Sequence, residues 1–283
     1  MEAAGPAMAD DFLHTRLGLT GLPVHRIGLS ATYRPGRDTV CRAIDEGINY
    51  FFCFGVDTQM MKVLREEMKG RREKFVVATG AYNLLFGHPN IERTLEKRLR
   101  QLGTDYIDVF MFLGVTKEKH FPPALIERFH RLKDGGKVRF IGLSTHARKF
   151  AGRLASEGLA DVLMIRYNAA HRGAEQDIFP FLAPYYPGVT SFTATRWREL
   201  IRRPSGAKWP KNDLVPTAGQ CYRFVLSNPA VHVCLMSPSN RRQFEDNMWE
   251  IREKGPLDPD EMKFMERFGD AVHHTGKRMF GRG

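Results

Sequence analysis

The sequence predicts a single (β/α)8 TIM barrel of the α/β class, and three observations predict it. The 283 residues are close to the roughly 250 residues that such a barrel typically needs. Short β-rich runs alternate with longer helical patterns, as parallel strands joined by crossover helices require. Strand runs such as Phe75-Val76-Val77-Ala78 are apolar on both faces, as in a sheet covered by helices. A doubly wound open sheet is the rival, but no GxGxxG motif follows the first strand.

Eight strands are expected, each a short run rich in β-branched and aromatic residues. They are Val24–Leu29, Tyr50–Phe54, Phe75–Thr79, Ile107–Leu113, Val138–Leu143, Val162–Arg166, Val189–Thr193 and His232–Met236. Helical patterns between them include Gly36–Glu46, Gln59–Lys69, Asn90–Gln101 and Ala124–Asp134. In the third of these helices Asn90 is the expected N-cap. Glu92 there places an acid in the first turn, where the helix dipole favours negative charge.

The two ends of the chain predict additions to the barrel. Turn residues alternate with apolar ones over Leu17–Pro23, which favours a short hairpin closing the barrel floor. A helix is expected over Asp260–Val272, followed by a basic, glycine-containing tail. Because the chain has no internal repeat and no low-complexity segment, residues 1–283 are expected to form one domain.

Composition excludes several classes of protein. The longest apolar runs are too short for a membrane span, which needs about 20 apolar residues, and residues 1–12 lack the apolar region of a secretory signal. The four cysteines are widely spaced without a CxxC pair, which favours reduced thiols in a cytoplasmic protein and no metal site. The formal charge of +11 comes from scattered basic residues without a nucleic-acid-binding motif. A solvated surface accounts for this charge, with help for a phosphate-bearing ligand as the alternative.

Several stretches, taken in order, are similar to those of one enzyme family. They are Leu17–Val24, Arg26–Leu29, Leu102–Asp108, Gly136–Ser144, Tyr167-Asn168 and Gln243–Asn247. The stretch Leu102–Asp108 resembles the entry to the family's fourth strand and is quite specific. On these residues the chain is identified as a member of the aldo-keto reductase family, with a resemblance that covers most of its length.

The resemblance implies hydride transfer from a nicotinamide to a carbonyl, with an aspartate, a tyrosine, a lysine and a histidine as catalytic residues. The corresponding positions in this chain are Phe52, Asp57, Gly80 and Leu113. Only Asp57 can titrate, and an ordinary carboxyl with a pKa near about 4 is ionised at neutral pH unless burial raises it. The usual carbonyl reduction is therefore expected to be lost, and Asp57 stays a candidate catalytic residue or an exposed loop residue.

The same resemblance implies NADP(H) as the cofactor and gives positions for its binding. They are Ser144, Thr145 and Arg166 for the carboxamide, Phe192 under the nicotinamide ring, and Ser237, Ser239, Gln243 and Asn247 for the remainder of the dinucleotide. Gln243 replaces the customary arginine for the 2′-phosphate. Its neighbours Arg241 and Arg242 are the expected substitutes, and Arg242 is the candidate. The alternatives are a core phenylalanine at Phe192 and an ordinary surface helix beyond Ser237.

A dense polar cluster over residues 166–175 follows the sixth strand, at the barrel end where active sites occur. Arg166, His171 and, after the fifth strand, His146 are candidate catalytic residues. A cationic pair there favours an anionic small-molecule substrate, and a histidine exchanges protons near neutral pH.

Three functions stay open, because function depends on the site and not on the fold. An NADP(H)-binding oxidoreductase with altered chemistry is favoured by Phe192 and the 237–247 stretch. A non-redox isomerase or lyase using the same barrel mouth, and a catalytically inactive barrel that senses a ligand, are the alternatives. The sequence does not specify the substrate or the oligomeric state.

Overall fold

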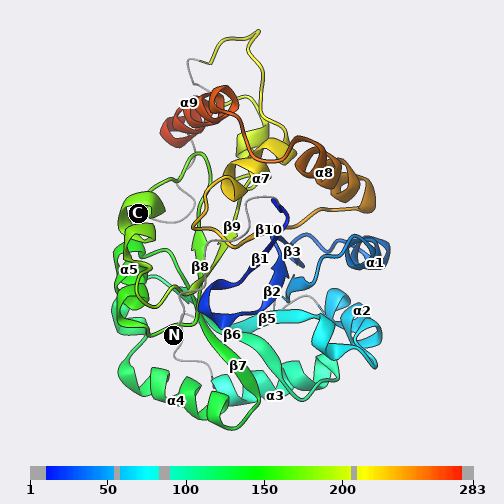
Figure 1. Ribbon diagram of the computed structural model, residues 1–283, viewed down its shortest axis with the longest axis vertical. Coiled ribbons are helices and arrows are strands. Elements are labelled where there is room, and N and C mark those ends of the chain that lie inside the picture. The colour runs from blue at the N-terminus through cyan, green and yellow to red at the C-terminus, as the bar shows by residue number, and fades with distance from the viewer. Residues whose placement is uncertain (1–10, 54–57, 83–89, 205–208, 276–283) are drawn as a thin grey trace.

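The structure, a computed structural model, describes residues 11–53, 58–82, 90–204 and 209–275. Within these ranges, eight parallel strands close into a barrel in the order β10-β3-β4-β5-β6-β7-β8-β9. The helices surround this barrel in a ring (Figure 1). The predicted (β/α)8 TIM barrel is thereby confirmed.

The bounds of the elements follow the alternation that the sequence predicts. The barrel strands are β3 (Ile27–Ser30), β4 (Tyr50–Phe52), β5 (Val76–Tyr82), β6 (Ile107–Val115), β7 (Val138–Thr145), β8 (Val162–Arg166), β9 (Gly188–Phe192) and β10 (Val233–Met236). The helices are α1 (Arg37–Asp45), α2 (Gln59–Glu67), α3 (Ile91–Leu102), α4 (Pro123–Asp134), α5 (Arg148–Glu157), α6 (Ala174–Asp177), α7 (Ala218–Leu226), α8 (Arg241–Lys254) and α9 (Pro259–Thr275). Asn90 caps α3 as expected, accepting a hydrogen bond from the Arg93 amide.

The first predicted strand, Val24–Leu29, is wrong as one element. Its start belongs to β2 (Pro23–His25), which pairs antiparallel with β1 (His14–Arg16), and the barrel strand β3 begins only at Ile27. The side chain of His25 explains the division, because its Nδ1 atom accepts a hydrogen bond of 2.9 Å from the Ile27 amide. That local bond turns the backbone at the junction between the hairpin and the barrel.

Apolar side chains fill the barrel from its floor to its mouth. Leu17, Leu22 and Val24 of the hairpin region pack in one cluster with inward-facing strand residues such as Tyr50. The hairpin therefore closes the end of the barrel at which the strands begin. A second, larger cluster lies between the outer face of the strands and the helices. The barrel interior is a packed core and not a channel.

Asp108 shows what the Leu102–Asp108 stretch does in the fold. Its carboxylate is fully buried on β6 and accepts hydrogen bonds from Arg72 Nη2 (2.7 Å), Arg139 Nη1 (2.8 Å) and the Val77 amide (2.9 Å). A buried carboxylate needs this number of partners to offset its desolvation. This stretch, whose sequence resemblance is quite specific, is thus structural, because Asp108 joins β6 to its neighbours β5 and β7.

A second buried charge holds the C-terminal helices together. Arg223 of α7 is 2% exposed and forms a bidentate ion pair with Glu261 of α9, with both N···O distances at 2.6 Å. Its remaining donors reach the carbonyl oxygens of Gly255 (2.7 Å) and Pro256 (3.1 Å), just beyond α8. Glu261 also closes a capping box with Asp258 at the start of α9.

Candidate active site at the barrel mouth

Three neighbouring strands bring the predicted carboxamide and ring positions to one edge of the barrel. In the parallel register Thr145 of β7 lies beside Ile165 of β8, and Arg166 of β8 lies beside Phe192 of β9. Ser144, one residue earlier on β7, is buried. Parallel strands end at the same edge, so these residues lie together at the carboxyl ends of the strands, where barrel enzymes carry their active sites.

A small cavity of about 10 Å³ lies in this edge, with space for about one water-sized sphere. Its lining residues are Thr145, His146, Arg148, Ile165, Arg166, His171 and Ile178. The structure thus brings together four residues that the sequence analysis named, from strands β7 and β8 and the loops that follow them. Arg148 was missed, although its position at the start of α5, shortly after the end of β7, was a usable signal.

The charges around the cavity leave one arginine uncompensated. Arg148 pairs with Asp177 at 2.8 Å, and Arg196 Nε lies 3.0 Å from Glu199 Oε2, an ion pair without hydrogen-bond geometry. Arg166 is half-buried, and its guanidinium forms no ion pair or hydrogen bond with any residue that the structure describes. Burial and the neighbouring arginines lower its pKa. Because a guanidinium stays charged in proteins, the mouth presents a fixed positive charge.

The two histidines of the cavity are uncharged at neutral pH. Burial, and secondarily Arg166, lowers the pKa of His146, whose buried Nδ1 atom has no hydrogen-bond partner among the described residues. Burial, followed by the charge of Arg166, lowers the pKa of His171 to about 3. The expected proton exchange by His171 near neutral pH is therefore not a property of the ligand-free protein, since desolvation disfavours the imidazolium.

The loop after β9 holds a strained backbone beside the cavity. Thr193, Arg196, Trp197 and Arg198 have φ angles of 61°, 48°, 50° and 73°, a region that residues other than glycine rarely adopt. Asn168 Nδ2 donates to the Thr193 carbonyl, and Arg196 Nη1 donates to a carbonyl of α9, each at 2.8 Å. Strain of this kind persists only where the surroundings impose it, and it clusters at functional sites.

The C-terminal helix also reaches the polar cluster after β8. His273 Nδ1 lies 2.6 Å from the Ala170 carbonyl oxygen, and the His273 and His171 rings are 5.3 Å apart, edge to face. A Cβ atom on Gly269 would overlap the Ala169 carbonyl, so α9 approaches this loop closely. His273 was not predicted as a site residue, because no short-range sequence pattern connects it to Ala170, 103 positions away.

The four positions at which the resemblance expects catalytic residues are apolar or outside the described residues. Phe52 and Leu113 are 4% and 1% exposed and belong to the cluster inside the barrel. At Gly80 a Cβ atom would overlap the Met111 carbonyl oxygen and lie 2.9 Å from Leu113 Cγ. Asp57 lies outside the described residues, as does Phe54, the predicted end of the second strand.

The remaining predicted cofactor positions lie just after β10 and on α8. Strand β10 is the neighbour of β9 in the barrel. The Ser237 hydroxyl donates to the Ser30 carbonyl and accepts from the Tyr33 amide, each at 3.0 Å. Gln243 Oε1 accepts from the Ser239 amide at 3.0 Å. Asn247 Nδ2 contacts the sulfur of Met236 at 3.8 Å.

The two arginines at the start of α8 differ in their partners. Arg241 pairs with Asp38 (3.0 Å) and Glu245 (2.9 Å), whereas the side chain of Arg242 is 92% exposed and 3.8 Å from Asp246. Arg242 is therefore the more available cation. Within the described part of the chain, no set of three His, Cys, Asp or Glu side chains is arranged to hold a metal ion. The helices described there also include none with the length and apolar character of a membrane span.

Fold and site together define a (β/α)8-barrel protein with a cationic pocket at the carboxyl ends of its strands. The aldo/keto reductase family model matches residues 36–190, and the chain belongs to this family.

The relatives support this assignment at modest similarity. The chain is 27% identical over 199 residues to aldo-keto reductase YhdN of Bacillus subtilis (strain 168), which covers 59% of this chain and 57% of that protein. It is 27% identical over 152 residues to the uncharacterized oxidoreductase YqkF of the same organism, covering 46% and 48%. The matches thus span about half the length of these curated relatives.

The solved structure of aldo-keto reductase AKR11C1 from Bacillus halodurans (holo form) superposes with a TM-score of 0.74. The superposition covers 90% of this chain and 95% of that chain at 20% sequence identity. A likeness at this identity shows the fold alone.

Proposed function

We propose that the protein is an NADP(H)-binding oxidoreductase whose chemistry differs from the usual carbonyl reduction of its family. The observation that carries the proposal is the half-buried Arg166, which has no acidic partner among the described residues and lies beside Phe192 in the strand register. The Ser144 hydroxyl, on the strand next to that of Arg166, is likewise without a hydrogen-bond partner in the described chain. Family membership and the holo form of a relative of the same fold support a dinucleotide as the ligand.

The residues at the mouth fit a nicotinamide. Ser144 and Arg166 offer hydrogen-bond donors for a carboxamide oxygen, and the Phe192 ring offers an aromatic face for stacking. When bound, the nicotinamide supplies or accepts a hydride. The fit is weaker at the end of β10, where the Ser237 hydroxyl already bonds the backbone of the loop after β3. A phosphate near α8 would be met mainly by Arg242.

The first prediction concerns the 2′-phosphate. If Arg242 binds it, NADPH should bind about ten- to a hundredfold more tightly than NADH, because a hydrogen bond to a charged group contributes about 1.5–3 kcal/mol. The measurement is titration with each nucleotide while nicotinamide fluorescence is followed. Arg242→Gln should remove the preference, while the control Arg252→Gln, farther along the same helix, should keep it. Equal affinities in the unmodified protein would contradict the proposed role.

The second prediction concerns the missing proton donor. With Phe52, Gly80 and Leu113 at the implied catalytic positions, we expect simple aldehydes and ketones to be reduced very slowly. A positioned general acid typically contributes about 10²–10⁴-fold to such a reaction. Steady-state oxidation of NADPH with a series of aldehydes measures this directly. Rapid turnover would show that these three residues do not occupy the catalytic positions.

A second candidate function is a non-redox isomerase or lyase that acts on an anionic small molecule. The unbonded Nδ1 of buried His146 and the uncharged His171 favour it, because both lie at the same cavity as Arg166. A neutral imidazole can accept a proton from a substrate that Arg166 holds. The third possibility, an inactive ligand-sensing barrel, predicts binding without turnover. We place the protein in the cytoplasm, because none of its four cysteines forms a disulfide.

A third prediction separates these functions. Arg166→Met should abolish binding of an anionic ligand or of NADPH, since it removes the uncompensated charge. His171→Gln should leave NADPH binding intact. It should abolish turnover only if residues of the cavity carry out acid–base catalysis. Both variants should melt within a few degrees of the unmodified protein, as should the exposed control Arg153→Met. If Arg166→Met binds normally, the arginine is structural and both enzyme proposals lose their main support.

A further inference from the structure

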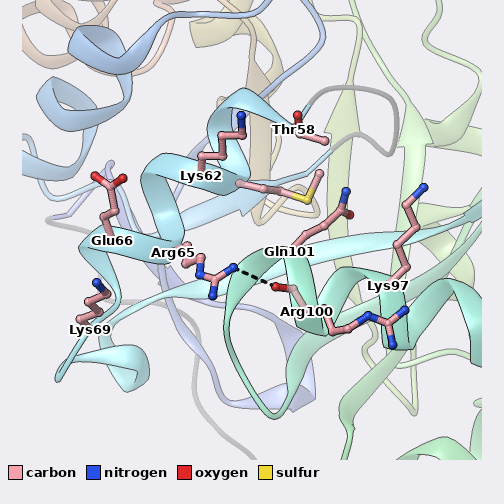
Figure 2. Close-up of a pocket in the computed structure, with 9 residues that line it drawn as sticks. Thr58, Lys62, Arg65, Glu66, Lys69, Lys97, Arg100 and Gln101 are labelled. Atoms are coloured by element: carbon pink, nitrogen blue, oxygen red, sulfur yellow. Dashed lines mark hydrogen bonds between the residues drawn. The ribbon is translucent and has the colours of Figure 1, made fainter.

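A hollow on the described surface lies outside the barrel, between α2 and α3, and not at the barrel mouth. It has a volume of about 580 Å³, in the range of ligand and peptide sites. It is lined by Thr58, Met61, Lys62, Arg65, Glu66, Lys69, Lys97, Arg100 and Gln101. We call it the α2–α3 groove; Figure 2 shows the α2 side chains along one wall and those of α3 along the other.

The groove carries a strong excess of positive charge. Lys62, Arg65 and Lys69 line the α2 wall, and Lys97 and Arg100 line the α3 wall. All five are exposed, and none forms an ion pair with any carboxylate in the described chain. Glu66, the one acid among the described lining residues, is already engaged, because Arg37 Nη1 lies 2.7 Å from its Oε2 atom. Among the described residues, no carboxylate therefore compensates these five cations.

The cations are spaced along a fixed frame. Lys62 and Arg65 are three residues apart, which places them on one face of α2, and Lys69 lies in the turn directly after this helix. Arg65 Nη1 donates to the Arg100 carbonyl at 3.2 Å and so bridges the two walls (Figure 2). Successive side chains of a peptide lying along the groove would meet charges at comparable intervals.

The other lining residues distinguish between classes of anionic partner. Met61 also lines the groove but is only 1% exposed, so it offers little apolar surface, and among the described residues no aromatic side chain lines the groove. Single-stranded nucleic acids are bound mainly by aromatic stacking together with charge. A membrane surface needs exposed apolar side chains on a face that can lie flat against it, and the groove is concave. A segment that is mainly acidic matches the side chains that are present.

We propose that the α2–α3 groove is a docking site for an acidic peptide segment of a partner protein. Carboxylates of the segment pair with the cations of the two walls. The site is separate from the barrel mouth and does not depend on the proposed cofactor. Because its contacts are mostly exposed ion pairs, binding should weaken steeply as ionic strength rises.

The test uses the whole protein and a fluorescein-labelled oligoglutamate peptide, followed by fluorescence anisotropy at low ionic strength. The unmodified protein should bind the probe, and Lys62→Glu combined with Lys97→Glu should weaken binding by about tenfold or more. The matched control combines Lys119→Glu with Lys211→Glu, two exposed lysines elsewhere that pair with no described carboxylate. The control reverses the same number of charges and should change Kd by less than about twofold.

Two results with the peptide would overturn the proposal: no binding by the unmodified protein, or equal weakening in both double variants. A third would be equally tight binding of an oligothymidylate by the unmodified protein, if Lys62→Glu combined with Lys97→Glu abolishes that binding. The last result would assign the groove to nucleic acid. Thermal melts of both variants establish that they are folded. Titration with NADPH should give the same result in all three proteins, so failure of the cofactor proposal leaves this test unaffected.

Discussion

Replacing Gly80 by alanine should lower the free energy of unfolding by about 3 kcal/mol or more, at the upper end of overpacking effects. The added Cβ atom would overlap the carbonyl oxygen of Met111 on the neighbouring strand β6, and no side-chain rotation can relieve a clash with backbone. For a chain of this size the loss corresponds to a fall in melting temperature of roughly 6–12 °C. Thermal or urea denaturation followed by circular dichroism measures it.

The matched control is Gly135→Ala at the end of α4, where the new Cβ atom would lie 3.4 Å from the nearest carbonyl oxygen. That variant should change stability by less than about 0.5 kcal/mol. If Gly80→Ala is equally benign, β5 and β6 are not packed as described here. The close approach of β6 to Gly80 also has a consequence for function. Because a lysine at position 80 does not fit this backbone, the family's usual catalytic group cannot be restored by substitution alone.

Removing the charge of Arg223 should cost about 3–5 kcal/mol, the range for breaking a buried ion pair by removal of one partner. Arg223→Met leaves Glu261 without its cation and the carbonyl oxygens of Gly255 and Pro256 without their donors. Since these groups join α7 to α8 and α9, denaturation should begin in the C-terminal helices. Urea titration of the variant measures the loss, and hydrogen exchange locates it.

The loss of stability caused by Arg223→Met should depend on pH with a defined sign. The hydrogen bond from Arg223 lowers the pKa of Glu261 in the folded protein below its ordinary value of 4.5. A depressed folded-state pKa gives stability that is fully present above the unfolded pKa and is lost as pH falls through the folded value. The difference between the unmodified protein and Arg223→Met should therefore be largest at neutral pH and shrink below about pH 4.

Arg252→Met is the control for the Arg223 variant. Arg252 pairs with Glu46 and Glu253 at the surface, where its side chain is 46% exposed. Exposed pairs contribute about 0–1 kcal/mol, so this variant should melt close to the unmodified protein. A difference between Arg223→Met and the unmodified protein that stays constant down to pH 3 would show that the ion pair with Glu261 is not its source.

The order of strands and helices could be predicted because it depends on local patterns. The apolar runs at Val162–Arg166 and Ile107–Leu113 are long enough to be recognised as strands, and alternation with helices leaves few topologies. The predicted ends of the strands were less accurate than their order. The division of Val24–Leu29 was missed because it depends on one side-chain bond, from the Ile27 amide to His25. No periodicity reports such a bond.

For the candidate site, the sequence alone determined which chemical groups follow each strand: Arg166 and His171 after one apolar run, His146 after another, and no titratable group at Phe52, Gly80 or Leu113. Chain connectivity and the common direction of parallel strands were enough to bring them to one edge.

Only the tertiary structure decided the state of those groups. It left Arg166 without an acid among the described residues, removed the charge of His171 by burial, and set the backbone of β6 against Gly80. It also gathered along one groove, beside α2 and α3, five cations that pair with no carboxylate among the described residues. Charge state, desolvation and close approach depend on residues far apart in the chain, so local sequence patterns do not contain them.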